Sequence, residues 1–377
     1  MFAYLDNAAT TRVWPQAAQA ALEEMTAGFG NPSARCAFGQ EAAQRLRDHR
    51  AGVARALGCR PEEVFFTSCG TEGDNWAIQA ADAYGRHRGR HIVTTAIEHA
   101  AVLEPLKALE AQGWTVTRLK PDRRGHVHPE DLRAALREDT VLVSMMLVNN
   151  ELGSLQPVAE CARLVKDYSP DILFHTDAVQ AFGKVPFTPE GLGVDLLTVS
   201  GHKIGAPKGI GVQYIRAGLR LPPLLRGGGQ ENGMRSGTEP TAQIAALASA
   251  CALWEAQGRA FREQMAQLKA RALHELQARV PGLEVVSAGD APHIFAISLP
   301  GYPSEMLVRA LSDRGVCVSS GSACHKGKPS HVFAALGLPK RTLMGVLRVS
   351  LSPESTRADV EALIEGLSAI QRERVGL

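Results

Sequence analysis

A lysine and an aspartate in this sequence could together bind a pyridine aldehyde. Lys203 stands in SGHKIGAPKG, directly after the apolar run DLLTVS, and Asp177 ends another apolar run, DILFHTD. A lysine at a strand end can form a Schiff base with a carbonyl compound. A carboxylate in such a place can keep a pyridine nitrogen protonated, which makes pyridoxal 5′-phosphate (PLP) an electron sink. Each residue also has an ordinary explanation, because Asp177 could cap a helix and Lys208 offers a second amine, in a Pro/Gly turn that predicts a surface position.

Two glycine-containing segments could bind a phosphate. TSCGTEGDN (67–75) follows VFFTS and opens a predicted helix, whose N-terminal N–H groups and dipole favour an anion. RGGGQENGMRSGT (226–238) has three consecutive glycines, so a backbone or a phosphate could approach it closely. Taken singly, the first could be an ordinary N-cap with Thr71 as the cap, and the second a surface loop. In chain order with Asp177 and Lys203, they favour a cofactor site at the carboxyl ends of the strands.

Cys324 is the strongest candidate for a nucleophilic thiol. It stands in SSGSACHKGKPSHVF (319–333), between the apolar stretches VCVSS and VFAALGL. The glycine, serine and lysine content predicts a mobile, accessible loop, and His325 with Lys326 and Lys328 favours the thiolate form. Most free cysteines are instead buried small hydrophobic residues. We expect such burial of the other candidates, Cys36, Cys59, Cys161, Cys251 and Cys317.

Short apolar runs alternate with helical patterns between residues 60 and 215. The runs are rich in β-branched residues and nearly continuous in hydrophobicity, which is typical of strands buried on both faces of a mostly parallel sheet. The predicted strands are 64–68, 91–96, 114–119, 140–148, 171–177, 195–200 and 209–215. The predicted helices between them are 71–84, 100–112, 129–138 and 157–167. This alternation indicates an α/β domain with helices on both faces of the sheet.

The pattern changes after Pro240. Two long helices are predicted, in TAQIAALASACALWEAQ and in FREQMAQLKARALHELQARV, and the second is expected to link two domains. Strands 293–299, 316–320 and 345–351 then alternate with helices 304–314 and 355–373. We therefore predict a large cofactor-binding domain over residues 15–257 and a small α+β domain over residues 258–377, which residues 1–14 join.

Charge and cysteine content exclude several classes of protein. The 377 residues include 41 Lys plus Arg and 39 Asp plus Glu, a balance that gives no reason to expect nucleic acid or an anionic membrane as the main partner. No apolar run approaches the roughly 20 residues that span a bilayer. The seven cysteines are scattered and form no CxxC pair, so we expect neither a disulfide scaffold nor a structural metal site, and we expect a cytoplasmic protein.

The whole set of motifs resembles a known family. The sequence is similar to cysteine desulfurases of the NifS/IscS-like branch, within class V of the PLP-dependent enzymes that share the aminotransferase fold (fold type I). The resemblance runs from YLDNAATT at residue 4 to the helix near residue 370. Its most specific strings are VNNELG, SGHKIGAPKGIG, MRSGT and SSGSAC, in that order.

This resemblance implies roles around the cofactor ring. It implies that Lys203 forms the Schiff base, that Asp177 partners the ring nitrogen and that His99 stacks on the ring, although a histidine there could also simply begin a helix. Asn150 and Gln180 would lie near the phenolic oxygen.

The resemblance also implies phosphate and substrate contacts. The implied phosphate contacts are Thr71, Ser200, His202 and, from a neighbouring subunit, Thr238, which implies a homodimer. Arg348 would hold the substrate carboxylate with two parallel hydrogen bonds, unless it lies on the outer face of its strand. Asn7 stands in a segment that would lie near the substrate.

The implied reaction moves sulfur from L-cysteine onto Cys324 as a persulfide and leaves alanine. The sulfur would then pass to a scaffold or carrier protein, for iron–sulfur cluster assembly or thio-modification. A selenocysteine lyase is an alternative, because its substrate differs by one atom. A class V transaminase is another, but it would have no use for SSGSAC. The intact set of Lys203, Asp177, Cys324 and Arg348 argues against a non-enzymatic scaffold subunit.

Two positions depart from the family pattern near the expected phosphate. Cys69 stands where the family usually has a small residue, often glycine, and Gly73 stands where it often has serine. Cys69 could be a second reactive thiol, but we expect a tolerated small side chain. These departures concern the details of the phosphate contacts and leave the predicted reaction unchanged.

Overall fold

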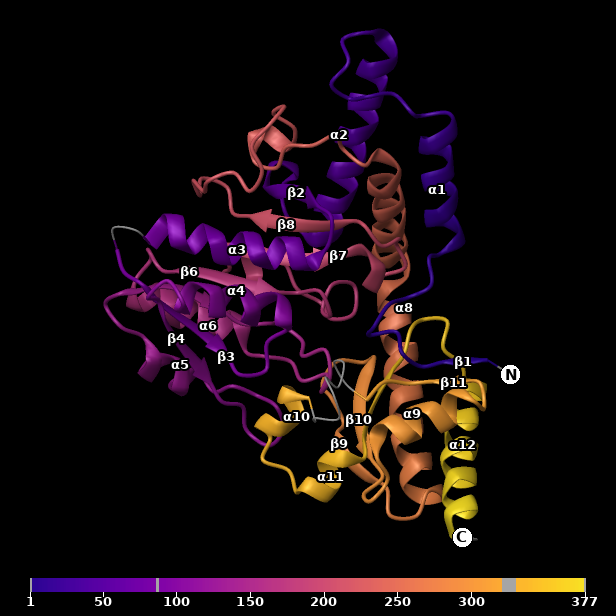
Figure 1. Ribbon diagram of the computed structural model, residues 1–377. Helices are drawn as coiled ribbons and strands as arrows, with labels where there is room; N and C mark the ends of the chain where they lie inside the picture. The colour runs from indigo at the N-terminus through magenta and orange to yellow at the C-terminus, as the bar shows by residue number, and fades with distance from the viewer. Residues whose placement is uncertain (1, 86–87, 321–329, 376–377) are drawn as a thin grey trace.

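The computed structural model describes residues 2–85, 88–320 and 330–375 (Figure 1). Its centre is a sheet of seven strands in the order β2-β8-β7-β6-β5-β3-β4. The strands are β2 (Val64–Thr67), β3 (His91–Thr95), β4 (Thr115–Leu119), β5 (Thr140–Ser144), β6 (Leu173–Asp177), β7 (Leu196–Ser200) and β8 (Gly211–Ile215). Within this sheet only β8 runs against its neighbours β2 and β7. The predicted mostly parallel sheet is therefore confirmed.

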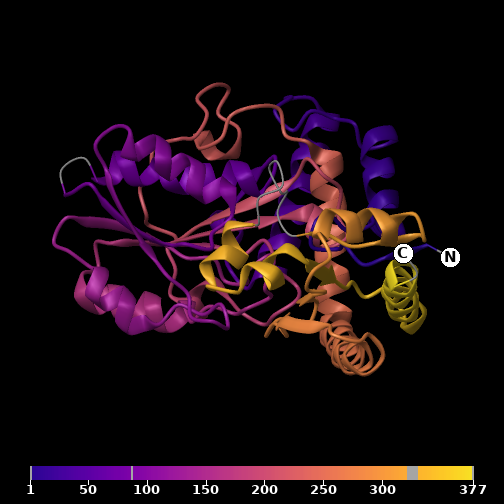
Figure 2. The ribbon, with the colours of Figure 1, turned by 60° about the horizontal axis from the view of Figure 1, so that its bottom comes forward.

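Every residue of the central strands β5, β6 and β7 is buried, as their continuous apolar sequences predict. Helices α3 (Gly70–Gly85) and α4 (Ala100–Glu110) cover one face of the sheet, and α5 (Pro129–Ala135) and α6 (Val158–Tyr168) cover the other (Figure 2). Because the strands that carry the site run parallel, their carboxyl ends share one edge, where ligands bind in open α/β sheets.

The apolar run 140–148 is longer than the strand that it was expected to form. β5 ends at Ser144, and the rest of the run continues as buried chain, with Leu147 N–H donating to the Asp177 carbonyl at 2.9 Å. Met146 and Val148 of this continuation line the cavity described below. Hydrophobicity alone could not separate these pocket residues from the strand.

One continuous helix, α8 (Thr241–Arg279), replaces the two long helices that the sequence predicted. Gly258 lies inside it, where glycine weakens a helix without having to end it. Packing against α1 (Pro15–Thr26) and α2 (Ala37–Leu57) offsets this weakness, with Trp14, Trp254 and Phe261 forming an aromatic cluster. The predicted domain boundary near residue 258 falls in the middle of α8, and it stays a prediction.

The C-terminal part is a smaller α+β domain (Figure 1). Its antiparallel sheet has the order β12-β10-β9, and the N-terminal strand β1 pairs with β11 in parallel. The strands are β1 (Ala3–Tyr4), β9 (Glu284–Ser287), β10 (Ile294–Ser298), β11 (Val316–Cys317) and β12 (Val346–Ser350). The helices are α9 (Ser304–Ser312), α10 (His331–Ala335), α11 (Lys340–Met344) and α12 (Arg357–Val375). The β1–β11 pairing brings the N-terminus to this small domain.

Short helical elements complete the large domain. These are α7 (Pro189–Leu192) and the 3₁₀ turns η1 (Pro61–Glu63), η2 (Gly201–Lys203) and η3 (Glu231–Gly233). No helix within the described residues is both long enough and apolar enough to cross a bilayer.

Candidate active site

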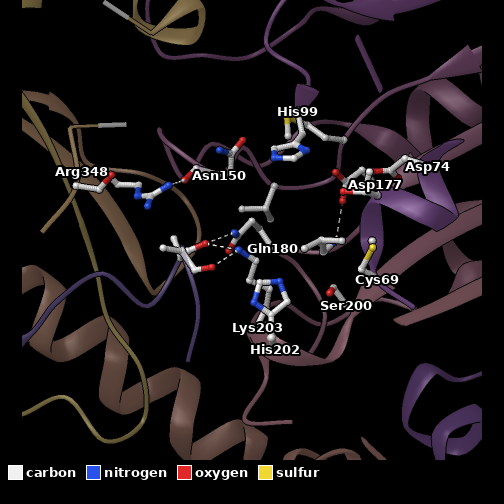
Figure 3. Close-up of a pocket in the computed structure, with 18 of the residues that line it drawn as sticks. Cys69, Asp74, His99, Asn150, Asp177, Gln180, Ser200, His202, Lys203 and Arg348 are labelled. Carbon is white, nitrogen blue, oxygen red and sulfur yellow. Dashed lines mark hydrogen bonds between the residues drawn. The ribbon is translucent and has the colours of Figure 1, made fainter. Parts of the chain in front are cut away.

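A cavity of about 540 Å³ lies at the carboxyl edge of the seven-stranded sheet, where the small domain meets it (Figure 3). Its walls bring together side chains from five strand ends, from the N-terminal segment and from β12. The described residues that line it are Ala8, Ala9, Cys69, Gly70, Thr71, Asp74, His99, Met146, Val148, Asn150, Asp177, Val179, Gln180, Ser200, His202, Lys203, Val308, Val318, Ser319, Ser320 and Arg348. Most of the predicted site residues therefore share one cavity.

Asp177 ends β6 at the back of the cavity. Its Oδ1 accepts a hydrogen bond from Val179 N–H at 2.9 Å, and burial raises the pKa of this carboxyl group, against the stabilising charges of His99 and Lys203. Burial and then the nearby Asp177 raise the pKa of Asp74 well above its usual range, which favours the protonated form of Asp74. This leaves Asp177 as the carboxylate that a cation in the cavity, such as a protonated ring nitrogen, would hold in its charged form.

Lys203 extends from η2, just after β7, into the cavity. Its ammonium Nζ donates to the backbone carbonyls of Ala8 at 2.6 Å and Ala9 at 2.8 Å. Burial and then the charge of Arg348 lower the pKa of Lys203 to about 8, which makes the free amine accessible near neutral pH. Lys208, the competing lysine, is exposed and does not line the cavity.

The predicted phosphate contacts lie between the N-terminus of α3 and the end of β7. Ser200 Oγ is buried and has no hydrogen-bond partner among the described residues, although it lines the cavity. A Cβ added to Gly70 would meet a Val179 methyl group at 2.8 Å, so glycine lets α3 approach these residues. Thr71, in the first turn of α3, is exposed toward the cavity. An anion placed here would meet the helix N-terminus and an unsatisfied hydroxyl group.

Charge and packing around α3 support this end of the site. Arg235 Nε lies 2.8 Å from Glu72 Oε1. This ion pair offsets the negative charge of Glu72, which lies in the first turn of α3 and would otherwise repel an anion. A Cβ at Gly73 would lie 2.7 Å from a Thr198 methyl group, which explains why glycine stands at this position.

His99 and Asn150 reach the cavity from two further strand exits, after β3 and β5, and Gln180 reaches it from the exit of β6, beside Asp177. His99 is the N-cap of α4, and its Nδ1 accepts from Ala101 N–H at 3.1 Å, so it has both the structural role and the cavity position that the sequence allowed. Asn150 Oδ1 is buried without a partner among the described residues. Gln180 Nε2 donates to the Ala8 carbonyl at 2.9 Å, beside the contacts of Lys203.

His202 also lines the cavity, beside Lys203. Its Nδ1 lies 3.2 Å from Thr10 Oγ1, and burial followed by the charge of Lys203 lowers the pKa of His202 to about 4. The ring is therefore neutral at ordinary pH and could donate one N–H to a phosphate.

Arg348, in the middle of β12, faces the large domain across the cavity (Figure 3). Its NH1 donates to the Asn150 carbonyl at 3.0 Å and its NH2 to Asp6 Oδ1 at 2.7 Å. Nε is buried and has no hydrogen-bond partner among the described residues. The predicted alternative, an arginine on the outer face of the strand, is wrong because the side chain is 5% exposed.

Two predicted residues, Asn7 and Thr238, do not line this cavity, and a third lies outside the described residues. Asn7 is buried, but its side-chain amide donates to the backbone carbonyls of Tyr4 and Ser350, and it does not line the cavity. Thr238 is exposed in the loop after η3, away from the lining of this chain's cavity. Cys324 lies outside the described residues. The predicted roles of Asn7, Thr238 and Cys324 stay predictions.

The other cysteines divide between buried and accessible positions. Cys161 and Cys251 are buried as predicted. Cys36 is exposed, so the prediction of its burial is wrong, because it lies in the loop that caps α2 rather than inside the helix. Cys59 and Cys317 are half-buried. Cys69 lines the cavity, with its sulfur 3.6 Å from Ser68 Oγ.

Sequence reasoning missed the contribution of residues 6–9. The carbonyls of Ala8 and Ala9 and the carboxylate of Asp6 bind Gln180, Lys203 and Arg348. Backbone carbonyls have no sequence signal. The string DNAA lies inside the motif YLDNAATT and marked the segment, but residue type drew attention to Asn7 alone.

Comparison with known proteins identifies the family of this chain. Residues 3–363 match the family described as Aminotransferase class-V. The chain belongs to this family. Among class-V aminotransferase relatives, cysteine desulfurase 1 of Trichormus variabilis is 42% identical, over 97% of this chain and 92% of that protein. Cysteine desulfurase IscS of Clostridium botulinum is 38% identical, over 98% of this chain and 94% of that protein. The resemblance inferred from the motifs is thus confirmed.

Solved structures confirm the class-V aminotransferase fold. A NifS-like protein superimposes with a TM-score of 0.93 at 36% identity, covering 99% of this chain and all of that one. A structure described as SspA in complex with cysteine gives a TM-score of 0.82 at 32% identity, covering 94% of this chain and 100% of that one.

Proposed function

We propose that this member of the Aminotransferase class-V family is a PLP-dependent cysteine desulfurase. One observation supports this most directly: the amine of Lys203, the carboxylate of Asp177 and the guanidinium of Arg348 line a single cavity. The curated relatives named above carry the same activity in their names over nearly the whole chain. A cavity with an amine at pKa about 8, a buried carboxylate and a cation suits an amino-acid substrate bound beside an aldehyde cofactor.

The described residues fit PLP by their unsatisfied polar atoms. Ser200 Oγ and Asn150 Oδ1 are buried in the cavity wall without partners in the described part of the chain. Ser200, with Thr71 and His202, would hold the phosphate, Asp177 the ring nitrogen, and Asn150 with Gln180 the phenolic oxygen. Lys203 would anchor the aldehyde. When bound, the cofactor would supply an electron sink that makes the substrate Cα–H bond acidic.

Arg348 and Lys203 would then act on the substrate itself. Arg348 would bind the L-cysteine carboxylate, for which its Nε–H is available. The Lys203 amine would accept the Cα proton, and its lowered pKa suits that task near neutral pH. The Ala8 and Ala9 carbonyls would keep the amine in reach between these steps.

Cys324 would receive the sulfur. Its thiolate would attack the substrate sulfur, forming an S–S bond as the substrate Cβ–S bond breaks. The electron pair of the broken bond would stay with the three-carbon product, which would take up protons and leave as alanine. The persulfide on Cys324 would pass its terminal sulfur to an acceptor protein, a scaffold or carrier of sulfur.

A second copy of the chain would complete the phosphate site. This part of the proposal rests on Thr238, which is exposed and away from its own chain's cavity. The exposed apolar side chains Leu22, Met25 and Phe29, at 49%, 59% and 70% exposure, offer a surface for such a homodimer. A sedimentation measurement that finds only monomers would contradict it.

The proposal is tested by product analysis of the PLP-loaded protein with L-cysteine and a thiol reductant. We expect alanine and sulfide in equal amounts. Cys324→Ser should keep the visible absorbance of bound PLP and lose at least about a hundredfold in rate. Cys36→Ser, which removes an exposed thiol outside the cavity lining, is the matched control and should keep the rate. Full activity of Cys324→Ser would refute the proposed sulfur transfer.

A further inference from the structure

We propose that Asp6 is a positioning residue that sets the affinity of this site for the substrate carboxylate. Asp6 Oδ1 accepts from Arg348 NH2 at 2.7 Å, while Arg348 NH1 donates to the Asn150 carbonyl at 3.0 Å. Two of the five N–H donors of the guanidinium are thereby used. Nε, at the third nitrogen, is buried without a partner among the described residues. The proposal rests on the proposed function, because it gives Arg348 the substrate carboxylate as its ligand.

The backbone around Asp6 is fixed to the strand that carries Arg348. Asp6 forms a parallel β-bridge with Ser350, two residues beyond Arg348 on β12. Asn7 donates to the Ser350 carbonyl from its backbone at 3.3 Å and from its side chain at 3.0 Å. Ala8 N–H donates to Ser350 Oγ at 2.8 Å. The carboxylate therefore stands on a segment cross-linked to the same strand as the guanidinium, which limits how far the pair can move.

The two contacts of Arg348 together fix the plane of its guanidinium. One comes from the N-terminal segment and the other from the loop after β5, so the two contacts are made by separate parts of the chain. A planar donor group held at both terminal nitrogens loses little entropy when a carboxylate binds to its remaining donors. Without Asp6, the side chain would keep one contact and could rotate about it.

Burial makes the counter-charge necessary. The Arg348 side chain is 5% exposed, and a buried cation without a partner is strongly unfavourable. Asp6, at 22% exposure, supplies that charge through one oxygen only, so the guanidinium keeps N–H groups that can donate to a second carboxylate. If the ion pair of Asp6 and Arg348 were purely structural, its loss would lower the stability of the fold. It would then affect the binding of ligands with and without a carboxylate to the same extent.

This difference allows a direct test with two amines. L-alanine carries the carboxylate and ethylamine is the same amine without it. Binding of each to the PLP-loaded protein is followed by the change in visible absorbance of the cofactor. Asp6→Ala is expected to weaken L-alanine binding about tenfold, as for one lost charge-assisted contact, and to change ethylamine binding less than about twofold.

A second variant and a control keep the test decisive. Asp6→Asn keeps the size and one acceptor oxygen, so it should fold even if Asp6→Ala does not, and should show the same selective loss reduced to about threefold. Asp167→Ala removes an exposed carboxylate outside the cavity and should leave both affinities unchanged. Melting temperatures of all variants separate lost stability from lost affinity.

The outcomes divide cleanly. A loss confined to L-alanine supports the proposal. An equal loss for both amines, tighter L-alanine binding, no change in either Asp6 variant, or a wild-type protein without preference for L-alanine would each overturn it. Conversion of L-cysteine to alanine by the wild type is measured in parallel. Absence of that conversion refutes the desulfurase function, whereas loss of carboxylate selectivity concerns Asp6 and Arg348.

Discussion

The cavity has two walls that are built in different ways. The strand-end wall, formed by Asp177, Ser200 and Lys203, continues one hydrogen-bonded sheet, so each side chain inherits its position from the strand before it. The small-domain wall, with Arg348 facing the N-terminal segment, is assembled from parts of the chain more than 300 residues apart and held by individual cross-links. Many backbone hydrogen bonds together fix the positions of residues at the ends of a sheet's strands. The position of a cross-linked residue depends instead on the two residues that form the cross-link. We therefore expect substitutions on the first wall to affect cofactor binding and substitutions on the second to affect the substrate.

The largest effect is expected at Lys203, on the strand-end wall. Lys203→Ala removes the residue proposed as both cofactor anchor and proton acceptor, so turnover of L-cysteine should fall at least about a thousandfold. The visible absorbance of the lysine-bound cofactor should vanish in the same variant. Lys208→Ala is the control, because Lys208 is exposed and outside the cavity lining, and its activity should match the wild type. Normal turnover of L-cysteine by Lys203→Ala would contradict the proposal that the strand-end wall binds the cofactor.

A smaller and different effect is expected across the cavity. Arg348→Lys keeps the charge but loses the planar pair of donors, so KM for L-cysteine should rise about 30- to 100-fold. Cofactor absorbance should stay unchanged, because Arg348 is not among the residues that would hold PLP. Steady-state kinetics and absorbance on the same sample check both statements. Simultaneous loss of cofactor and substrate binding would show that the two walls are not independent.

The two walls also differ in what the sequence could predict. Asp177, Ser200 and Lys203 each follow an apolar run, so the parallel-sheet rule alone brings them to one edge. The role of Arg348 was predicted only from the family resemblance, because the sequence of its strand does not show which face of the strand the arginine occupies. Asp6 and the Ala8 and Ala9 carbonyls could not be predicted, since their contacts depend on the cross-links of residues 6–9 to β12 and on backbone atoms common to every residue.

Two further differences have simple physical causes. The long helix α8 was predicted as two, because Gly258 and its polar neighbours resemble a break when the stabilising contacts with α1 and α2 are not known. The β5 run was predicted too long, because buried pocket lining and buried strand have the same hydrophobicity.

The smallest effect on turnover is expected for Glu98, behind the strand-end wall. Its Oε1 accepts from Thr95 Oγ1 at 2.8 Å and from Met146 N–H at 2.9 Å, while Oε2 is buried without a partner among the described residues. Burial raises the pKa of Glu98 from 4.5 to about 8. Between these two values the folded protein holds a proton that the unfolded chain has released, so stability should fall as the pH rises from 4.5 to 8.

Glu98→Gln should remove this pH dependence while leaving desulfuration unchanged. The neutral amide has no proton to release, so the variant should gain at least about 1.4 kcal/mol relative to the wild type on going from pH 5 to pH 8, the value of one pKa unit. Urea unfolding at the two pH values measures this difference. Glu138→Gln, at an exposed carboxylate, should keep the wild-type slope. If Glu98→Gln kept that slope as well, Glu98 would be ionised in the folded protein. A second buried charge would then lie behind the strand-end wall and interact with Asp177, which would weaken the proposal that Asp177 is the carboxylate that a bound cation keeps ionised.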